Sequence, residues 1–396
     1  MLIILLLVIA VSFYLVKTHM EQSKLQPFYN TNGLSVKGKL GEVVRQEPLN
    51  VKLLNGSAVR VIYRTQKSDS SYTFSSGMIF IPNNTNAGLP RPIVAWAHGT
   101  LGFGDQCAPS RLSNPLSSVT WVDNMLAKGW IVTATDYAGF GTPGIQGYLI
   151  GQDESNDVIN SVRAAQNIKD SKAGNDYVIW GHSQGGNSAL FSAYNSKQYD
   201  SSLNLLGVVA SAPAAELVPL LNEQYGSVAD WVIGPLVGVS WPASNAKLNV
   251  SDIMTSSGIN NYKRIANQCI LQSTLVGLIR NAIGMKFFSI NPTTITSWKD
   301  MAIKQSAPII KPVTPVYVIE SKSDQVVLPN TTALYIQQSC SQGSNIDTLW
   351  LDNVAHQDIP KATSQQVITW LSQRFEKKQN ISTCKDTLPI APATLQ

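Results

Sequence analysis

Charged residues are scarce in this chain. They account for 14% of its 396 residues, whereas hydrophobic residues account for 44%. This composition excludes an intrinsically disordered chain, which needs many charges and few apolar groups, and it predicts a globular protein with a large core. The formal net charge is +5, but the lysines and arginines are scattered along the sequence rather than clustered. We therefore expect no nucleic-acid partner.

Cysteine is also rare. The chain contains Cys107, Cys269, Cys340 and Cys384, and none of them belongs to a C-x-x-C pair. Without that spacing a zinc or redox site is disfavoured, so we expect no bound metal. The even number favours two disulfides formed in an oxidising compartment. The spacing of the cysteines leaves the three possible pairings open.

The chain opens with an apolar run, residues 1–16, which lacks a basic segment before it and a clear small-residue cleavage site. The run is shorter than the roughly 20 residues that span a bilayer comfortably. We predict that it directs export, which makes the protein secreted or periplasmic. Two fates stay open for residues 1–16, removal as a signal peptide or retention as an N-terminal membrane anchor. Residues 17–40 are interpreted as a linker.

The most informative motif is Gly181-His-Ser183-Gln-Gly185, which lies between an apolar run at 177–180 and a helix-forming segment at 187–194. A serine can attack an ester carbonyl only if its hydroxyl projects from a sharp turn. Flanking glycines remove the Cβ atoms that would block such a turn. G-x-S-x-G between a strand and a helix is therefore typical of serine hydrolases, and we interpret Ser183 as the nucleophile. The alternative is an ordinary strand-to-helix turn.

Strands and helices are expected to alternate around this motif. Helical spacing predicts helices at 119–128, 153–168 and 330–339. Apolar, β-branched or aromatic runs predict strands at 59–64, 72–81, 92–97, 130–135, 177–180, 205–210, 313–320 and 345–351. This alternation predicts an α/β fold with a mostly parallel, doubly wound sheet, preceded by antiparallel strands.

About one hundred residues, 213–312, interrupt the alternation, and we predict that they form an inserted helical cap or lid. The core is then made of residues 41–212 and 313–385, followed by a C-terminal tail, 386–396. The apolar segments of the cap are too broken by glycine and proline to span a membrane. They either form the cap's own core or line an acyl groove. The candidates for the groove are Leu220, Leu221, Trp231, Val232, Ile233, Leu236, Val237, Trp241, Leu275 and Leu278.

Partners for Ser183 are expected past later strand ends. Asp324 follows the strand at 313–320, and His356 follows the strand at 345–351. The order Ser, Asp, His is that of α/β-hydrolases. Side chains at the carboxyl ends of neighbouring parallel strands can converge on one crevice. We therefore predict Asp324 as the acid and His356 as the general base of a catalytic triad.

Other residues compete for these two roles. Three further histidines are assigned elsewhere: His19 lies beside the export segment, His182 lies within the motif, and His98 precedes a loop. Among the acids, Asp352 is the main rival of Asp324. Three further acids are less suitable. Glu320 lies before the loop that carries Asp324, Asp347 lies within the predicted strand at 345–351, and Asp136 lies in the loop that carries Tyr137.

An ester hydrolase also needs N–H donors that stabilise its tetrahedral intermediate. We predict the backbone amide of Gln184, next to the nucleophile, as one donor of this oxyanion hole. The second is expected in the loop after the strand at 92–97, where we choose Thr100. The alternative is that His98-Gly99 forms a plain turn.

Several ordered motifs resemble the secretory lipases of the Candida antarctica lipase A type and their bacterial relatives. The resemblance covers most of residues 40–385. The motifs are Asp105-Gln-Cys107-Ala-Pro-Ser110, Asp136-Tyr-Ala-Gly-Phe140, Gly181-His-Ser-Gln-Gly185, Ser323-Asp324-Gln-Val-Val-Leu-Pro329, and Cys340-Ser-Gln-Gly-Ser-Asn-Ile346 leading to Ala355-His356. His98-Gly99-Thr100 looks like the bacterial relatives, whereas lipase A has a different residue type at the position of Thr100.

The resemblance implies the α/β-hydrolase fold, the triad of Ser183, Asp324 and His356, and hydrolysis of acylglycerols and other carboxylic esters without a cofactor. It also implies the disulfides Cys107–Cys269 and Cys340–Cys384. The expected partners are an acyl ester or lipid substrate and a lipid interface. Two rival functions stay open, a capped serine peptidase of the same fold and a catalytically silent binding protein.

Overall fold

The computed structural model describes residues 18, 20–83 and 90–394. Residues 1–16, the predicted signal peptide or anchor, lie outside the described residues. Among the described helices, none has both the length and the apolar character needed to cross a membrane.

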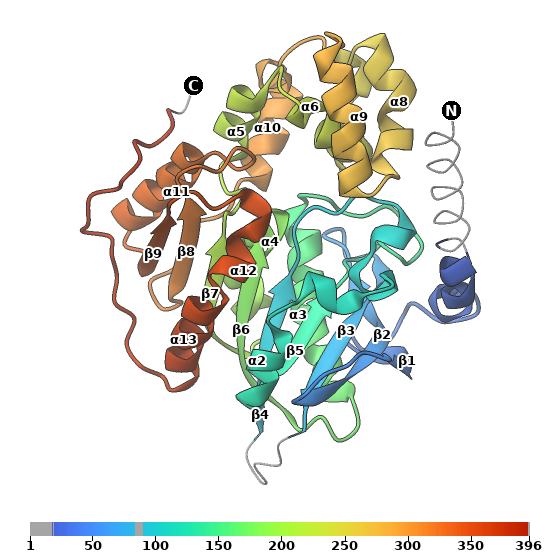
Figure 1. Cartoon of the computed structure of the whole chain (residues 1–396), viewed down its shortest axis with the longest axis vertical. Coiled ribbons are helices and arrows are strands. Elements are labelled where there is room, and N and C mark those ends of the chain that lie inside the picture. The colour runs from blue at the N-terminus through green and yellow to red at the C-terminus, as the bar shows by residue number, and fades with distance from the viewer. Residues whose placement is uncertain (1–17, 19, 84–89, 395–396) are drawn as a thin grey trace, which may run out of the picture.

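A nine-stranded sheet forms the centre of the described chain (Figure 1). Its order is β1-β2-β3-β5-β4-β6-β7-β8-β9. The pairs β1–β2, β2–β3 and β3–β5 are antiparallel, and all pairs from β5 to β9 are parallel. The strands are β1 (Val43–Pro48), β2 (Gly56–Gln66), β3 (Tyr72–Pro82), β4 (Arg91–Ala97), β5 (Ile131–Thr135), β6 (Ala173–His182), β7 (Asn204–Ser211), β8 (Val316–Ser321) and β9 (Ile346–Leu351). The predicted mostly parallel, doubly wound sheet is confirmed.

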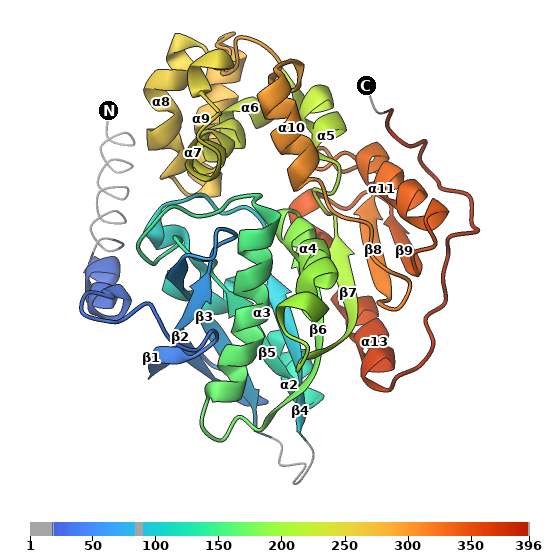
Figure 2. The same ribbon diagram turned by 180° about the vertical axis from the view of Figure 1, so that it is seen from behind.

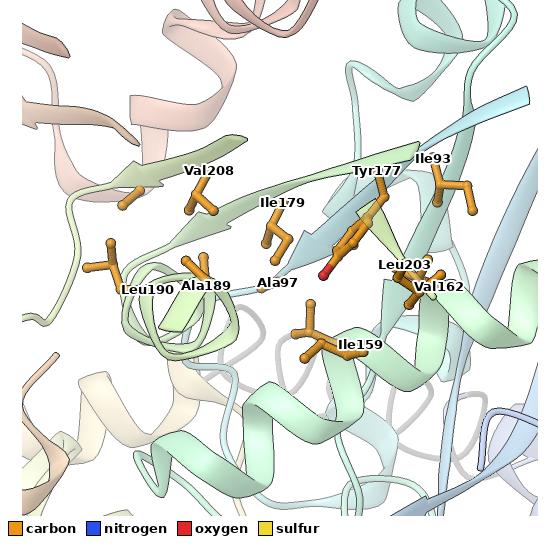
Figure 3. Packing of buried hydrophobic residues seen from close by; sticks show 14 of the residues in the cluster. Ile93, Ala97, Ile159, Val162, Tyr177, Ile179, Ala189, Leu190, Leu203 and Val208 are labelled. Atoms are coloured by element: carbon orange, nitrogen blue, oxygen red, sulfur yellow. The ribbon is translucent and has the colours of Figure 1, made fainter. Parts of the chain in front are cut away.

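Helices cover both faces of the sheet. In the view of Figure 1, α2 (Val122–Ala127), α12 (Ile359–Ala362) and α13 (Ser364–Phe375) lie in front, and Figure 2 shows α3 (Gly151–Asn167) and α4 (Gln184–Tyr199) on the other face. Helix α11 (Pro329–Ser341) connects β8 to β9. In Figure 3, Ile159 and Val162 of α3 and Ala189 of α4 face Tyr177 and Ile179 of β6. The strands between these layers are continuously apolar because both of their faces are buried.

Six helices stand between β7 and β8, where the sequence predicts a cap. They are α5 (Leu217–Gln224), α6 (Ala229–Val232), α7 (Gly234–Ser244), α8 (Ser256–Ala266), α9 (Ile270–Ala282) and α10 (Thr296–Gln305). Figures 1 and 2 show them together at one end of the sheet. Their apolar cluster includes Trp231, Trp241 and Trp298, and it also takes in Tyr148 and Val327 of the core. A parallel sheet with such an insertion after β7 is the α/β-hydrolase fold.

The two flanking segments pack onto this core. Residues 20–29, which the sequence analysis assigns to a linker, form a helix, and its Phe28 and Tyr29 are buried against Ile62 and Phe74. Near the C-terminus, the backbone N–H of Ala393 donates to the carbonyl oxygen of Asn330 over 2.9 Å. Burial of Phe28 and Tyr29 anchors the first segment to the core and offsets part of the conformational entropy that the segment loses on ordering.

Candidate active site

Ser183 occupies a strained turn between β6 and α4. Its backbone has φ 58° and ψ −118°, a region that residues with a side chain rarely adopt. A Cβ atom on Gly181 would lie 1.9 Å from the carbonyl oxygen of Gly185, and a Cβ atom on Gly185 would lie 1.9 Å from the carbonyl oxygen of Ala97. Both glycines are therefore required by close backbone packing. The turn points the serine out of the strand end, as G-x-S-x-G predicts.

Asp324 and His356 form a buried hydrogen-bonded pair. The Nδ1 atom of His356 lies 2.6 Å from Oδ2 of Asp324, and their side chains are 3% and 0% exposed. The other carboxylate oxygen of Asp324 accepts the backbone N–H groups of Val326 and Val327 over 2.7 and 3.1 Å. Three donors thus hold the carboxylate in one orientation, which fixes the ring of His356 as well.

The second ring nitrogen of His356 is free for chemistry. Its Nε2 atom is buried and makes no hydrogen bond with the described residues, Ser183 Oγ included. The ring lies beside the turn that carries Ser183, since its centroid is 4.7 Å from that of His182. Nε2 is therefore the ring nitrogen of His356 that can accept a proton at this turn.

The rival acids make other contacts. Asp352 is 72% exposed and pairs with Lys322 over 2.6 Å. Glu320 is buried and accepts the hydroxyl of Thr332 over 2.6 Å, and burial together with the Asp324 carboxylate raises the pKa of Glu320 well above its usual value. Asp347 is half-buried on β9. Of these carboxyl groups, only Asp324 hydrogen-bonds to His356.

Asp136 serves the loop that follows β5. Its carboxylate accepts the hydroxyl of Ser76 over 2.6 Å and the backbone N–H of Ser110 over 2.9 Å. The Ser110 hydroxyl also donates to it. These bonds hold the segment around Cys107 and the loop of Tyr137 together, which agrees with the structural role expected from the sequence.

The predicted oxyanion residues flank the nucleophile. Gln184 is the first residue of α4, so its backbone N–H lies at the start of the helix. Its side chain donates to Oε1 of Glu154 over 2.5 Å. The hydroxyl of Thr100 lies 2.9 Å from that of Tyr148. Gly99, before it, passes so close to the turn that a Cβ atom there would lie 3.0 Å from Nδ1 of His182. Amides at a helix N-terminus and in a neighbouring loop suit a developing anion.

Glu154 and His182 lie near the site and make contacts that the sequence does not predict. Glu154 of α3 is buried below α4, accepts Ser188 Oγ over 2.5 Å and the Leu149 N–H over 3.0 Å, and burial raises its pKa to about 8. His182 was treated only as part of the motif, yet its Nε2 atom lies 3.0 Å from the carbonyl oxygen of His356. The contacts of Glu154 could not be predicted, because an acid within a helical pattern carries no signal for them. The contact of His182 with His356 could not be predicted either, because it joins segments far apart in sequence.

A narrow apolar pocket lies in the cap. Its lining includes Val326, whose backbone N–H donates to Asp324, but it does not include Ser183, Asp324 or His356. Its cavity volume is about 70 Å³. Five of the predicted groove residues line it, namely Leu220, Leu221, Ile233, Val237 and Trp241.

The remaining groove candidates are elsewhere. Trp231, Val232 and Leu236 are buried within the cap but do not border the pocket. The prediction for Leu275 and Leu278 is wrong, because their side chains are 59% and 50% exposed on the outside of α9. That helix packs on the cap through small residues instead of its leucines.

All four cysteines form disulfides. Cys107, in a short 3-10 helix at Asp105–Cys107, is bonded to Cys269 at the start of α9, and Cys340 of α11 is bonded to Cys384. This is the pairing that the family resemblance implies. Among the described residues, no cluster of three or more histidine, cysteine or acidic side chains is arranged to hold a metal ion.

Comparison with known proteins places the chain among lipases. The model of a family described as secretory lipase matches residues 117–383. The secreted triacylglycerol lipase LIP2 of Malassezia furfur is 22% identical over 352 residues, which cover 82% of this chain and 72% of that protein.

Solved structures share the fold. Candida antarctica lipase A superposes with a TM-score of 0.75 at 15% identity, covering 93% of this chain and 89% of that one. The rice cell wall degrading esterase LipA of Xanthomonas oryzae superposes with a TM-score of 0.72 at 15% identity, covering 86% of this chain and 100% of that one.

Proposed function

Because this chain belongs to the secretory lipase family, we propose that it is an exported serine hydrolase that cleaves acyl esters through an acyl-enzyme. Membership of the family makes it a carboxylic ester hydrolase. The observation that carries the serine mechanism is the buried Asp324–His356 hydrogen bond of 2.6 Å beside the strained turn of Ser183. Such a base, oriented by an acid and lying next to a serine on a sharp turn, supports nucleophilic catalysis.

The first half-reaction forms the acyl-enzyme. Ser183 Oγ attacks the acyl carbonyl carbon while its proton passes to Nε2 of His356, and the buried Asp324 carboxylate stabilises the imidazolium. The carbonyl oxygen becomes an anion that receives the backbone N–H groups of Gln184 and Thr100, each worth about 3 kcal/mol in the transition state. When the C–O bond to the alcohol breaks, His356 returns the proton to the leaving oxygen.

The second half-reaction restores the enzyme. Water attacks the acyl carbon and gives a proton to His356, the bond to Ser183 Oγ breaks, and His356 protonates the serine. This cycle releases one alcohol and one carboxylic acid for each ester and needs no cofactor. The Tyr148 hydroxyl, 2.9 Å from that of Thr100, orients the Thr100 side chain.

The substrate class follows from the pocket. Its lining is apolar apart from Gln224 and Asp230. An acyl chain needs only a dry groove, whereas a peptide needs polar groups for its amides and its terminal amine. We infer that acyl esters of lipids, including triacylglycerols, are the substrates. The two disulfides and the similarity to the secreted lipase of Malassezia furfur support export.

The experiment replaces Ser183 with alanine and measures hydrolysis of p-nitrophenyl butyrate. Activity should fall by roughly three orders of magnitude or more, as removal of a triad nucleophile does, with little change in Tm. A serine-directed phosphonate should label the native protein and leave the S183A variant unlabelled. Activity of the variant within about tenfold of the native rate would exclude Ser183 as the nucleophile.

A further inference from the structure

Helix α9 carries its large apolar side chains on the outside of the protein. At least half of the surface of each of these residues is exposed: Leu271 (79%), Leu275 (59%), Leu278 (50%), Ile279 (57%) and Ile283 (68%). With 3.6 residues per turn, these positions fall on one side of the helix and continue into the residue that follows it. We call this strip the α9 outer face. Monomeric proteins seldom expose contiguous apolar patches unless the patch binds something.

The inner side of α9 packs through two small residues and the half-buried Val276. Ser273 and Gly277 are its buried positions. A Cβ atom on Gly277 would lie 3.1 Å from Cβ of Trp231 and 3.3 Å from a methyl carbon of Val232, so α9 rests closely on α6. A surface helix normally turns its apolar side inward. Here packing within the chain is achieved without the leucines, so the fold does not account for them.

The sequence around α9 is basic. From Ile253 to Lys299 it contains no aspartate or glutamate. The basic residues of this segment are Lys263, Arg264, Arg280, Lys286 and Lys299, of which Lys263, Arg264 and Lys286 are exposed. Exposed apolar side chains together with lysine and arginine match a lipid surface, where acyl chains lie beneath anionic headgroups.

The start of α9 is attached to the proposed oxyanion loop. The N–H of Ile270 donates to the carbonyl oxygen of Leu101 over 2.9 Å, and Gly102 pairs with Cys269 in a β-bridge. The disulfide from Cys269 to Cys107 adds a covalent link. The α9 outer face therefore keeps a fixed position relative to Thr100, and a surface bound there is held close to the site.

We propose that the α9 outer face docks the protein onto an anionic lipid surface, which is the source of its ester substrates. The inference rests on the proposed function. A second copy of the chain fits this face poorly. Contact of α9 with its own copy would bring two basic segments together, and no acidic residue within 253–299 would offset their repulsion.

The test compares two apolar surfaces of the same protein. The variant L271Q/L275Q replaces two leucines of the α9 outer face with glutamine, which is also a good helix former. The matched control is L54Q, because Leu54, before β2, is 79% exposed, as is Leu271. Binding is measured by sedimentation with vesicles of equal parts phosphatidylcholine and phosphatidylglycerol. The double variant should bind at least about tenfold more weakly than the native protein, and L54Q should bind like it.

Two further measurements separate the outcomes. Hydrolysis of soluble p-nitrophenyl butyrate should be equal in all three proteins, which shows that they are folded. The variant K263Q/K286Q should lose affinity for the anionic vesicles but not for pure phosphatidylcholine. Absence of soluble-ester hydrolysis in the native protein would count against the proposed function, and vesicle binding would still decide on docking.

Equal vesicle binding by the native protein and L271Q/L275Q would overturn the docking proposal. It would also be overturned if the native protein were a dimer without vesicles and the double variant a monomer, since the occupant of the face would then be a second copy.

Discussion

The Nε2 atom of His182 lies 3.0 Å from the backbone carbonyl oxygen of His356. Burial and the neighbouring His356 ring lower the pKa of His182 well below its usual value, so the ring is neutral and donates its Nε2–H to that oxygen. The residue before the proposed nucleophile therefore holds the loop of the proposed base. This contact sets the distance between two parts of the site that lie 174 positions apart in sequence.

Replacement of His182 should disturb the alignment of the site. H182L fills the buried site with an apolar side chain and loses the N–H donor to the carbonyl oxygen of His356. We expect kcat to fall roughly tenfold to a hundredfold with little change in KM. H182Q retains an N–H donor and should recover part of the rate. Steady-state kinetics with p-nitrophenyl butyrate provide the measurement, and native kcat in H182L would show that the hydrogen bond has no positioning role.

The two aspartates beyond β8 and β9 should differ sharply. D324N replaces the oxygen that binds His356 Nδ1, which stabilises the wrong tautomer of the ring, and should lower kcat by about 10⁴. D352N removes only an exposed contact with Lys322 and should leave kcat nearly unchanged. Each variant serves as the control for the other. The reverse ranking would assign the role of the acid to Asp352.

Glu154 should make stability depend on pH. Its pKa rises from 4.5 to about 8 in the folded state because of burial, so the folded protein holds a proton that the unfolded chain releases. Stability then falls as pH rises through this window. E154Q mimics the protonated acid and lacks this loss. Urea unfolding from pH 5 to about 8 should show the free energy of unfolding of E154Q gaining on that of the native protein. A constant difference would mean that Glu154 is ionised throughout.

Acyl length should control turnover. Each methylene buried in the cap pocket contributes about 0.8 kcal/mol, so we expect kcat/KM to rise from acetate to a maximum near about C6 to C10. L220W narrows the pocket and should move the maximum to shorter chains, whereas I303W changes a cap residue that is 55% exposed and should not. The measurement uses p-nitrophenyl esters below their micellar limits. A steady decline from acetate onward would show that the pocket does not receive the acyl chain.

Sequence patterns predicted the sheet well where burial is uniform. The run at 92–97 corresponds to β4, and the helical spacing at 153–168 corresponds to α3. Strands buried on both faces are continuously apolar, and helices packed on them repeat their apolar residues at helical spacing. The cap was harder. Its apolar residues have similar composition whether they face the pocket or solvent, so Leu275 could not be told from Leu220 without the packing of α9 on α6.

The site divides in the same way. The turn at Ser183 could be predicted from its neighbours, because it demands glycines at both sides. The positions of Asp324 and His356 past the ends of β8 and β9 could be predicted from chain order, and their catalytic roles stay predictions. The contacts of Glu154 with Gln184 and of His182 with His356 could not, since each depends on how distant segments pack.

Cys107 and Cys269 are separated by 162 positions, and this distance has a consequence for biosynthesis. At translation rates of about 5–20 residues per second, Cys107 exists for roughly ten to thirty seconds before its partner has been made. By then the ribosome has completed β4, β5, β6 and β7, and the nucleophile turn between the last two. Loss of the Cys107 thiol therefore reports the moment at which the cap reaches the nascent core. Trapping that thiol with an alkylating reagent at timed intervals would give the order of assembly of the two layers.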